Sequence, residues 1–385
     1  MAHAPRPAPL PRRTARPQRV AALAALAPIL ATTLAATLAT APLLAQDVAR
    51  AQGGGDSAAA RAPAPLFATA DPLRFELRAD FKAVFRDRDT LSKKRYPAAL
   101  AFTAADGRPV ALPVEIAPRG HFRLQPRICG FPPLRVVLPK GETKDTPFAG
   151  QRSLKLATHC RDGNDEYEQY VLREYLVYRT FNLLTERSFR VRLARATYIE
   201  ERDTLSRRSA YAFFVEDEDR VAKRNGGKVV ELTGARHEDL DPEQTHLVAM
   251  FQYFVGNTDF SLSFLHNIRL VSEGYNYYPV PYDFDWSGVV GTDYAKPDAR
   301  LSIRSVRERL YRGPCLTREQ FAPTFERFSA RRADIYALYD GLADLDLDYR
   351  RRARQYYDRF YEELRDGWEA WKSVQRGCEA RGSTD

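Results

Sequence analysis

Three polar side chains surround one predicted hairpin in the second half of the chain. Asp259 lies in a loop after an apolar helix, Asn267 begins the hairpin, and Asp283 follows it directly. A turn centred on Gly274 places the two ends of the hairpin opposite each other, so we expect Asn267 and Asp283 to meet. Converging hard oxygen ligands suit Mg²⁺ or Mn²⁺. This pattern predicts a divalent-metal site, with Asp285 as a further ligand and Asp259 placed to accept a proton from, or orient, an incoming hydroxyl.

A second pair of charged residues lies in the first half of the chain. Glu174 falls on the apolar face of a predicted helix, between Val171 and Tyr178. An unpaired carboxylate there would be costly, so it needs a cation. Lys155 lies on the strand just before that helix, among apolar neighbours. We expect a Lys155–Glu174 ion pair, which can hold a lysine against nucleotide phosphates.

Each of these residues also has an ordinary structural explanation. Asp259 could belong to a turn that ends a helix. Lys155 could be an exposed strand residue, Glu174 could pair with a nearby arginine, and Asp283 could cap a strand end. The functional interpretation depends on the order of these residues along the chain, because no P-loop, dinucleotide fingerprint or nucleophile motif accompanies them.

The elements that must position these residues differ between the two halves of the chain. Apolar alternation over 73–158 predicts strands, followed by a helix over 166–184 and further strands over 191–199 and 211–215. From Asp241 onward the pattern is mainly helical, interrupted by the hairpin that carries the polar residues. A β-rich first half and a helical second half predict an α+β protein.

This order of parts resembles that of protein kinases. More closely it resembles the spore coat protein H family, exported bacterial atypical kinases with a plan of RG, LKL, D, HN and DFD. The matching pieces in this chain are Arg119-Gly120, Leu154-Lys155-Leu156, Glu174, Asp259, His266-Asn267 and Asp283-Phe284-Asp285. The resemblance covers about residues 115–290. It implies one two-lobed protein-kinase-like fold, with a β-rich small lobe over 71–215 and a mainly helical large lobe over 216–380.

The resemblance also implies roles for the residues of the first half. Lys155 would bind nucleotide phosphates and Glu174 would position it. Arg119 lies in the stretch Pro118–His121, the only candidate for a phosphate cover, because the chain has no G-x-G-x-x-G loop. Glu216 falls where the family places the hinge beside the nucleotide.

In the second half, the resemblance makes Asp259 the catalytic base or orienting group and gives Asn267 and Asp283 to the metal ions. Besides the missing G-x-G-x-x-G loop, the chain departs from the kinase pattern at two further points. Asp259 is further from Asn267 than in the usual kinase catalytic loop, and Asp285 stands where kinases carry a glycine.

Two functions of different classes follow. The first is an enzyme that uses ATP or another nucleotide with Mg²⁺ or Mn²⁺. It would transfer a phosphoryl or nucleotidyl group to a protein or other exported acceptor, with positioning and charge neutralisation supplying most of the rate. The second is a catalytically silent binding or cell-envelope assembly module, which the scarcity of nucleotide outside the cytoplasm favours. The presence of Lys155 together with several candidate metal ligands favours the enzyme hypothesis.

Residues 1–45 predict an export signal. This segment holds five arginines and no acidic residue, and its apolar run ends at the small residue Ala45. It carries more than half of the +9 net charge, so we do not predict nucleic acid as a partner. Cleavage would deliver the chain to the periplasm, cell surface or medium, and an uncleaved run would anchor it in the membrane. Residues 46–70, rich in Ala, Gly and Pro, predict a disordered linker.

The chain has four cysteines, an even number that predicts disulfides in an exported protein. Three connectivities are possible. We expect Cys129 to pair with Cys160, because each lies beside a strand of the first half. Cys315 and Cys378 bracket the C-terminal helices and would then pair by default.

Overall fold

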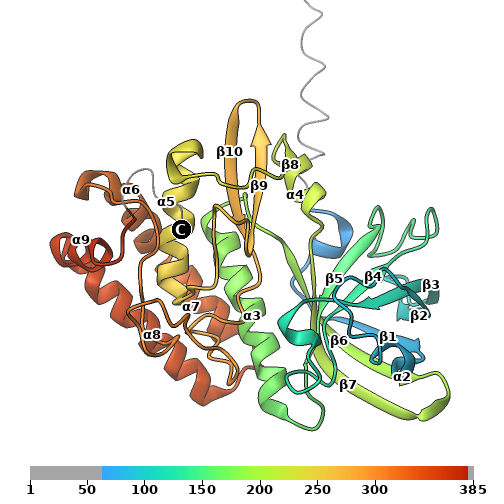
Figure 1. Ribbon diagram of the computed structural model, residues 1–385. Coiled ribbons are helices and arrows are strands. Elements are labelled where there is room, and N and C mark those ends of the chain that lie inside the picture. The colour runs from blue at the N-terminus through green and yellow to red at the C-terminus, as the bar shows by residue number, and fades with distance from the viewer. Residues whose placement is uncertain (1–62, 380–385) are drawn as a thin grey trace, which may run out of the picture. The chain divides into compact units, whose positions relative to one another are not determined.

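The structure is a computed structural model that describes residues 63–379 (Figure 1). The predicted export signal, 1–45, and most of the predicted linker, 46–70, lie outside the described residues. At the end of that linker range, residues Pro65–Phe67 form a short 3-10 helix, η1, whose Leu66 and Phe67 are buried against the barrel core.

Seven strands close into a barrel in the order β1-β2-β3-β4-β5-β7-β6. Neighbouring strands are antiparallel except β1 and β6, which run parallel. Alternation directs every second side chain inward, as in β1, where Leu73, Phe75, Leu77 and Ala79 are buried. The strands are β1 (Leu73–Ala79), β2 (Tyr96–Thr103), β3 (Pro109–Pro118), β4 (Leu134–Val137), β5 (Ser153–Ala157), β6 (Val191–Glu200) and β7 (Asp203–Val215).

A long helix, α3 (Asp165–Leu184), follows β5 and lies between the barrel and the other helices (Figure 1). Its ring of Tyr178 lies 5.6 Å from that of Phe213 on β7. On its other side, Phe181 lies 4.5 Å from Phe251 of α5 (Pro242–Val255). Each fully buried aromatic side chain of this kind contributes roughly 1.5–3 kcal/mol to stability. α3 thus belongs to a core that it shares with β7 and the helices, and the interior of the barrel forms a second, separate core.

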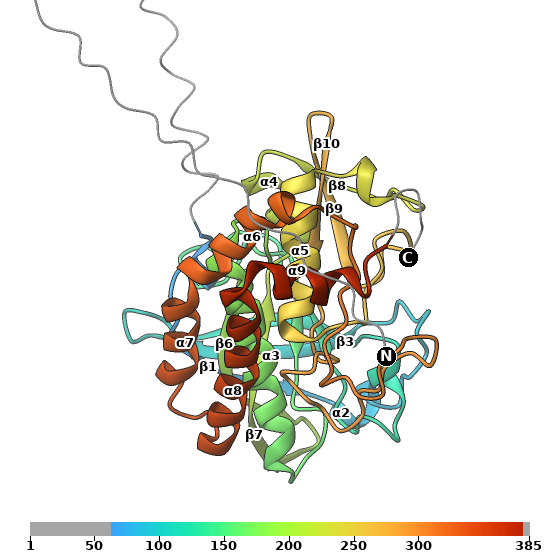
Figure 2. The ribbon, with the colours of Figure 1, turned by 90° about the vertical axis from the view of Figure 1, so that its left-hand side faces the viewer.

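The second half of the chain adds a small antiparallel sheet, in the order β10-β9-β8, and four C-terminal helices (Figure 2). The hairpin expected around Gly274 is formed by β9 and β10, with Pro281 opposite Ile268. The elements are α4 (Glu218–Arg224), β8 (Lys228–Val230), β9 (Ile268–Glu273), β10 (Asn276–Pro281), α6 (Arg318–Ala330), α7 (Arg332–Gly341), α8 (Leu347–Arg365) and α9 (Gly367–Gln375). Shorter pieces are α2 (Phe81–Val84), η2 (Phe122–Leu124) and η3 (His237–Asp239).

The predicted fold class, a two-lobed protein-kinase-like α+β fold, is wrong. The first half forms a closed mixed barrel, a small second sheet stands beside the helices, and all described residues belong to one compact unit. Closure comes from the parallel pairing of β1 with β6, in which Leu73 lies opposite Ala194. Period-two alternation is the same in an open sheet and in a barrel, so the sequence pattern carried no signal for this pairing of distant strands.

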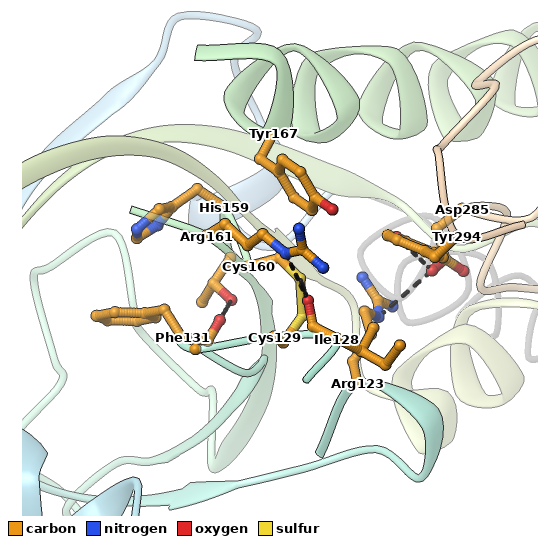
Figure 3. The surroundings of a disulfide bond; sticks show 12 residues. Arg123, Ile128, Cys129, Phe131, His159, Cys160, Arg161, Tyr167, Asp285 and Tyr294 are labelled. Atoms are coloured by element: carbon orange, nitrogen blue, oxygen red, sulfur yellow. Dashed lines mark hydrogen bonds and ion pairs between the residues drawn. A yellow bond between two sulfur atoms is a disulfide. The ribbon is translucent and has the colours of Figure 1, made fainter. Parts of the chain in front are cut away.

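Both predicted disulfides, Cys129–Cys160 and Cys315–Cys378, are present. Figure 3 shows the first, beside the chain segment that carries Arg123. Closing a loop of its 31-residue separation contributes about 3.7 kcal/mol in the loop-entropy model. Two disulfides fit an oxidising environment outside the cytoplasm. Among residues 63–379, none of the helices has the length and apolar character needed to span a bilayer.

Candidate functional site

Three carboxylates from distant parts of the chain meet in one cluster, which we call the acidic centre: Glu174, Asp283 and Asp285. One oxygen of each lies within 4.8 Å of the others. Glu174 and Asp285 are only 4% and 5% exposed, whereas Asp283 is half-buried at the edge of the cluster. Carboxylates gathered in this way form an oxygen ligand set for a divalent cation.

Local structure fixes the two aspartates. Asp283 lies two residues after the end of β10 and adopts a left-handed backbone with φ 62°, and its N–H donates to Tyr178 Oη at 2.7 Å. Asp is among the residues that tolerate this conformation best. Between the two aspartates, Phe284 is fully buried, with its ring 4.8 Å from Tyr178 and 5.6 Å from Phe251. The buried phenyl group therefore anchors the turn that presents Asp283 and Asp285 to Glu174.

An arginine from η2 lies among these three carboxylates. Arg123 approaches Asp283 at 2.7 Å, Asp285 at 3.4 Å and Glu174 at 3.8 Å. Tyr294 donates a further hydrogen bond to Asp285 at 2.8 Å, as Figure 3 shows for Arg123, Asp285 and Tyr294. Sequence reasoning missed Arg123, because one arginine among 59 basic residues carries no signal of its own.

Arg123 does not neutralise the acidic centre completely. Burial, only partly offset by Arg123, raises the pKa of Glu174 to about 8, and the same balance raises the pKa of Asp285 to about 7. Asp283 behaves differently: burial alone would raise its pKa, but Arg123 and Arg119 together lower it. A bound divalent cation would lower both raised pKa values and hold Glu174 and Asp285 in their charged forms. This donor set fits Mg²⁺ or Mn²⁺.

Lys155 does not pair with Glu174, contrary to the prediction. Its ammonium lies 3.4 Å from Glu218, which also accepts a hydrogen bond from Arg269 at 2.8 Å. The reason is the strand register: Lys155 on β5 is paired with Val215 on β7, and α4 begins just after that strand. Burial, followed by the nearby charge of Arg119, lowers the pKa of Lys155 to about 8.

Arg119 and Lys155 provide positive charge beside Asp283. Both contribute to the lowered pKa of that carboxylate, which places them within electrostatic reach of it. Among the described residues, no carboxylate forms an ion pair with Arg119. Two cations beside a divalent-metal ligand set are an arrangement that suits phosphate groups bound to the metal.

Asp259 forms a second cluster with the two residues that begin the hairpin. Asn267 Nδ2 donates to Asp259 Oδ2 at 3.0 Å and to its backbone carbonyl at 2.7 Å, and His266 lies 3.0 Å from Oδ1. Its bond with Asp259 raises the pKa of His266, more than burial lowers it. Within the described chain, no hydrogen bond joins Asn267 to Asp283, because Tyr282 closes the hairpin end and Asp283 lies beyond it.

Glu216, the predicted hinge residue, is part of a structural ion pair. Its buried carboxylate accepts bonds from Arg224, at 3.0 Å from Nη2, and from the backbone N–H of Arg190 at 3.1 Å. Arg224 also donates to the carbonyls of Glu186 and Ser188. These contacts leave Glu216 buried and paired.

A pocket of about 880 Å³ opens beside Asp259. Its lining combines aromatic and basic side chains, among them Phe264, Trp286, Lys296 and Arg312. Phe264 is 74% exposed at its rim. The pocket gives a ligand direct access to the Asp259 carboxylate.

Comparisons with known proteins do not place the chain in a family: neither the protein-family models nor the curated proteins contain a match.

Proposed function

We propose that this chain is an exported phosphotransferase that uses ATP or another nucleotide with Mg²⁺ or Mn²⁺. The observation that carries the proposal is the convergence of Glu174, Asp283 and Asp285 on one point, beside Lys155 and Arg119. Kinship with the spore coat protein H family is part of the proposal and rests on the sequence motifs. The proposal depends on the site, and it does not require a kinase-like architecture.

In this proposal the carboxylates of the acidic centre hold the cation, and Lys155 and Arg119 bind the nucleotide phosphates. A bound divalent ion would neutralise phosphate charge as it develops during transfer. Asp259 accepts the proton of the acceptor hydroxyl or orients that hydroxyl, with His266 and Asn267 fixing the carboxylate. The pocket beside Asp259 would receive the acceptor, a protein or another molecule of the cell envelope.

Export is supported by the two disulfides and by the basic and apolar sequence of residues 1–45. We propose that the segment is cleaved near Ala45 and that the mature chain works in the periplasm, at the cell surface or in the medium.

One observation favours a second function, a catalytically silent module for binding or envelope assembly. Arg123 already contacts all three carboxylates of the acidic centre, and such an ion cluster can hold a fold together without any metal. In that case the acidic centre would be structural, and the partner would bind elsewhere.

A thermal-shift measurement separates the two functions. The mature chain, starting at Gln46, is melted with ATP and Mn²⁺, with each alone, and with ATP and EDTA. The phosphotransferase proposal expects a rise in Tm that needs both components. No rise with any nucleotide and either Mg²⁺ or Mn²⁺ would leave the assembly module as the better account.

A further inference from the structure

A small pocket of about 230 Å³ lies between α3, the residues that follow Asp285, and α8. Four of its lining residues are arginines: Arg173, Arg307, Arg352 and Arg359. Only one acidic residue, Glu166, belongs to the lining, and it is already bound to Arg173 at 2.8 Å. The pocket therefore collects several positive charges around a space large enough for a small ligand.

The arginines on α8 differ in whether they have a bonding partner. Arg351 pairs with Asp348, Arg354 pairs with Asp340 at 2.6 Å, and Arg350 donates to the carbonyl of Leu342. Among the described residues, by contrast, no carboxylate pairs with either Arg352 or Arg359. These two residues are two helical turns apart, so they lie on the same face of α8.

Arg307 joins this face from the loop before α6. Among residues 63–379, no carboxylate forms an ion pair with Arg307. Gly288 allows the close approach of that loop, since a Cβ at this position would lie 2.2 Å from the carbonyl oxygen of Val306 and 3.0 Å from the Cα of Arg307. Like charges brought together without acidic partners repel each other, so the arrangement suits an anion that binds among them.

Arg173 forms the buried wall of the pocket. It is only 2% exposed, its guanidinium lies 4.1 Å from the centre of the Tyr349 ring, and its Nη1 donates to the carbonyl of Val290. Its Nε and Nη2 are buried without a hydrogen-bond partner in the described structure. A charged group held so rigidly is preorganised to attract an anion.

We propose that Arg173, Arg307, Arg352 and Arg359 form a binding site for a phosphate-type oxyanion, free or at the end of a phosphorylated molecule. Guanidinium groups recognise such oxyanions through paired, charge-assisted hydrogen bonds. The site is distinct from the acidic centre, although Arg173 and Glu174 are neighbours on α3 and face different ligands. It does not depend on the proposed phosphotransferase activity.

The test is titration calorimetry of the mature chain with inorganic phosphate in EDTA, at constant ionic strength, with chloride as the reference anion. The double variant Arg352→Gln/Arg359→Gln should lose at least tenfold in phosphate affinity. The matched control Arg351→Gln/Arg354→Gln removes the same charge from the same helix, and it should stay within twofold of the wild type. Both pairs are exposed and should leave the fold intact, which a melting curve without phosphate verifies.

The outcomes are distinct. A wild type that does not bind phosphate, or equal losses in the two double variants, would overturn the proposal in favour of general charge attraction. Lys155→Ala should bind phosphate as tightly as the wild type. A loss of phosphate affinity in this variant would place the anion at the proposed nucleotide site and refute the arginine pocket. A phosphoserine peptide that binds more tightly than inorganic phosphate would identify a phosphorylated protein as the source, and equal or weaker binding would identify the free ion.

Discussion

Nη2 of Arg123 lies 2.7 Å from Oδ1 of Asp283, although the two residues are 160 positions apart. This contact joins a short helix that follows the barrel strand β3 to the turn that ends the hairpin β9–β10. It also means that a cation bound by Asp283 and Asp285 would compete with Arg123 for the same oxygens. Arg123 is therefore the residue that most directly links the stability of this protein to its proposed metal site.

Arg123→Gln should lower the free energy of unfolding by about 3 kcal/mol, because it leaves the buried carboxylates without their cation. Mn²⁺ alone should then raise the Tm of this variant more than that of the wild type, since the ion no longer competes with the guanidinium. Melting curves with and without Mn²⁺ provide the measurement. Arg127→Gln is the control, as Arg127 is exposed and bonded to Gln125 in the same loop. An equal Mn²⁺ response in all three proteins would exclude competition.

The pKa of Lys155, lowered from 10.5 to about 8 by burial and by Arg119, gives nucleotide binding a defined pH dependence. The ammonium is charged at pH 7 and loses its proton as the pH rises through 8, so its contribution to the affinity for Mg²⁺–ATP should fall between about pH 7.5 and 9. Glu174 titrates in the same range in both proteins, whereas the side chain in Lys155→Arg stays charged, so the affinity of the wild type relative to Lys155→Arg should fall over this range. Titration calorimetry at several pH values tests this, and parallel declines in both proteins would rule out Lys155 as the titrating group.

The same shift affects stability with a defined sign. Because the folded-state pKa lies below the unfolded value, the unfolded chain binds more protons between about pH 8 and 10.5. The contribution of Lys155 to the free energy of unfolding should therefore increase with pH across that window. Denaturant unfolding of wild type and Lys155→Met, which cannot titrate, isolates this contribution. A difference between the two proteins that stays constant from pH 8 to 10.5 would show that the shift is absent.

Glu216→Gln should reduce stability by about 3 kcal/mol, because it leaves the buried Arg224 with only the more distant carboxylate of Glu186, at 3.6 Å. Its nucleotide affinity should stay within twofold of the wild type, since Glu216 is occupied by Arg224 and Arg190. Asp219→Asn, an exposed acid in the adjacent helix α4, is the control and should change neither property. A tenfold loss of nucleotide affinity in a stable Glu216→Gln protein would restore the hinge role predicted from the sequence.

Local features of this chain and its two disulfides were predictable from the sequence, whereas the pairing of distant strands was not. The helix expected over 166–184 is α3 (Asp165–Leu184), and the hairpin expected around Gly274 is β9–β10. Both follow from local periodicity and turn residues. The parallel pairing of β1 with β6 depends on segments far apart in sequence, so the barrel was missed.

In the candidate site, too, the sequence predicted local properties and did not predict which distant residues meet. Glu174 was predicted to be buried and in need of a cation, because its position on the apolar face of a helix is a local property. The predicted cation, Lys155, was wrong: Arg123 lies beside Glu174, and Lys155 forms an ion pair with Glu218. Which charged side chains meet is decided by strand register and loop path, and neither is encoded in spacing along the chain.

Asp283 tests the central claim most directly, that this acidic centre binds a metal with a nucleotide. Because Asp283 is paired with Arg123 and its pKa is lowered, Asp283→Asn should also lose about 1–3 kcal/mol of stability. Asp298→Asn is the matched control, because Asp298 is an exposed acid paired with Arg300.

The measurement is the Kd of ATP by titration calorimetry with Mn²⁺ and again with EDTA, for wild type, Asp283→Asn and Asp298→Asn, at a temperature where all three are folded. We expect Mn²⁺-dependent binding in the wild type and in Asp298→Asn, and at least a hundredfold weaker binding in Asp283→Asn. Wild-type binding that Asp283→Asn retains unchanged would contradict the assignment of the metal site.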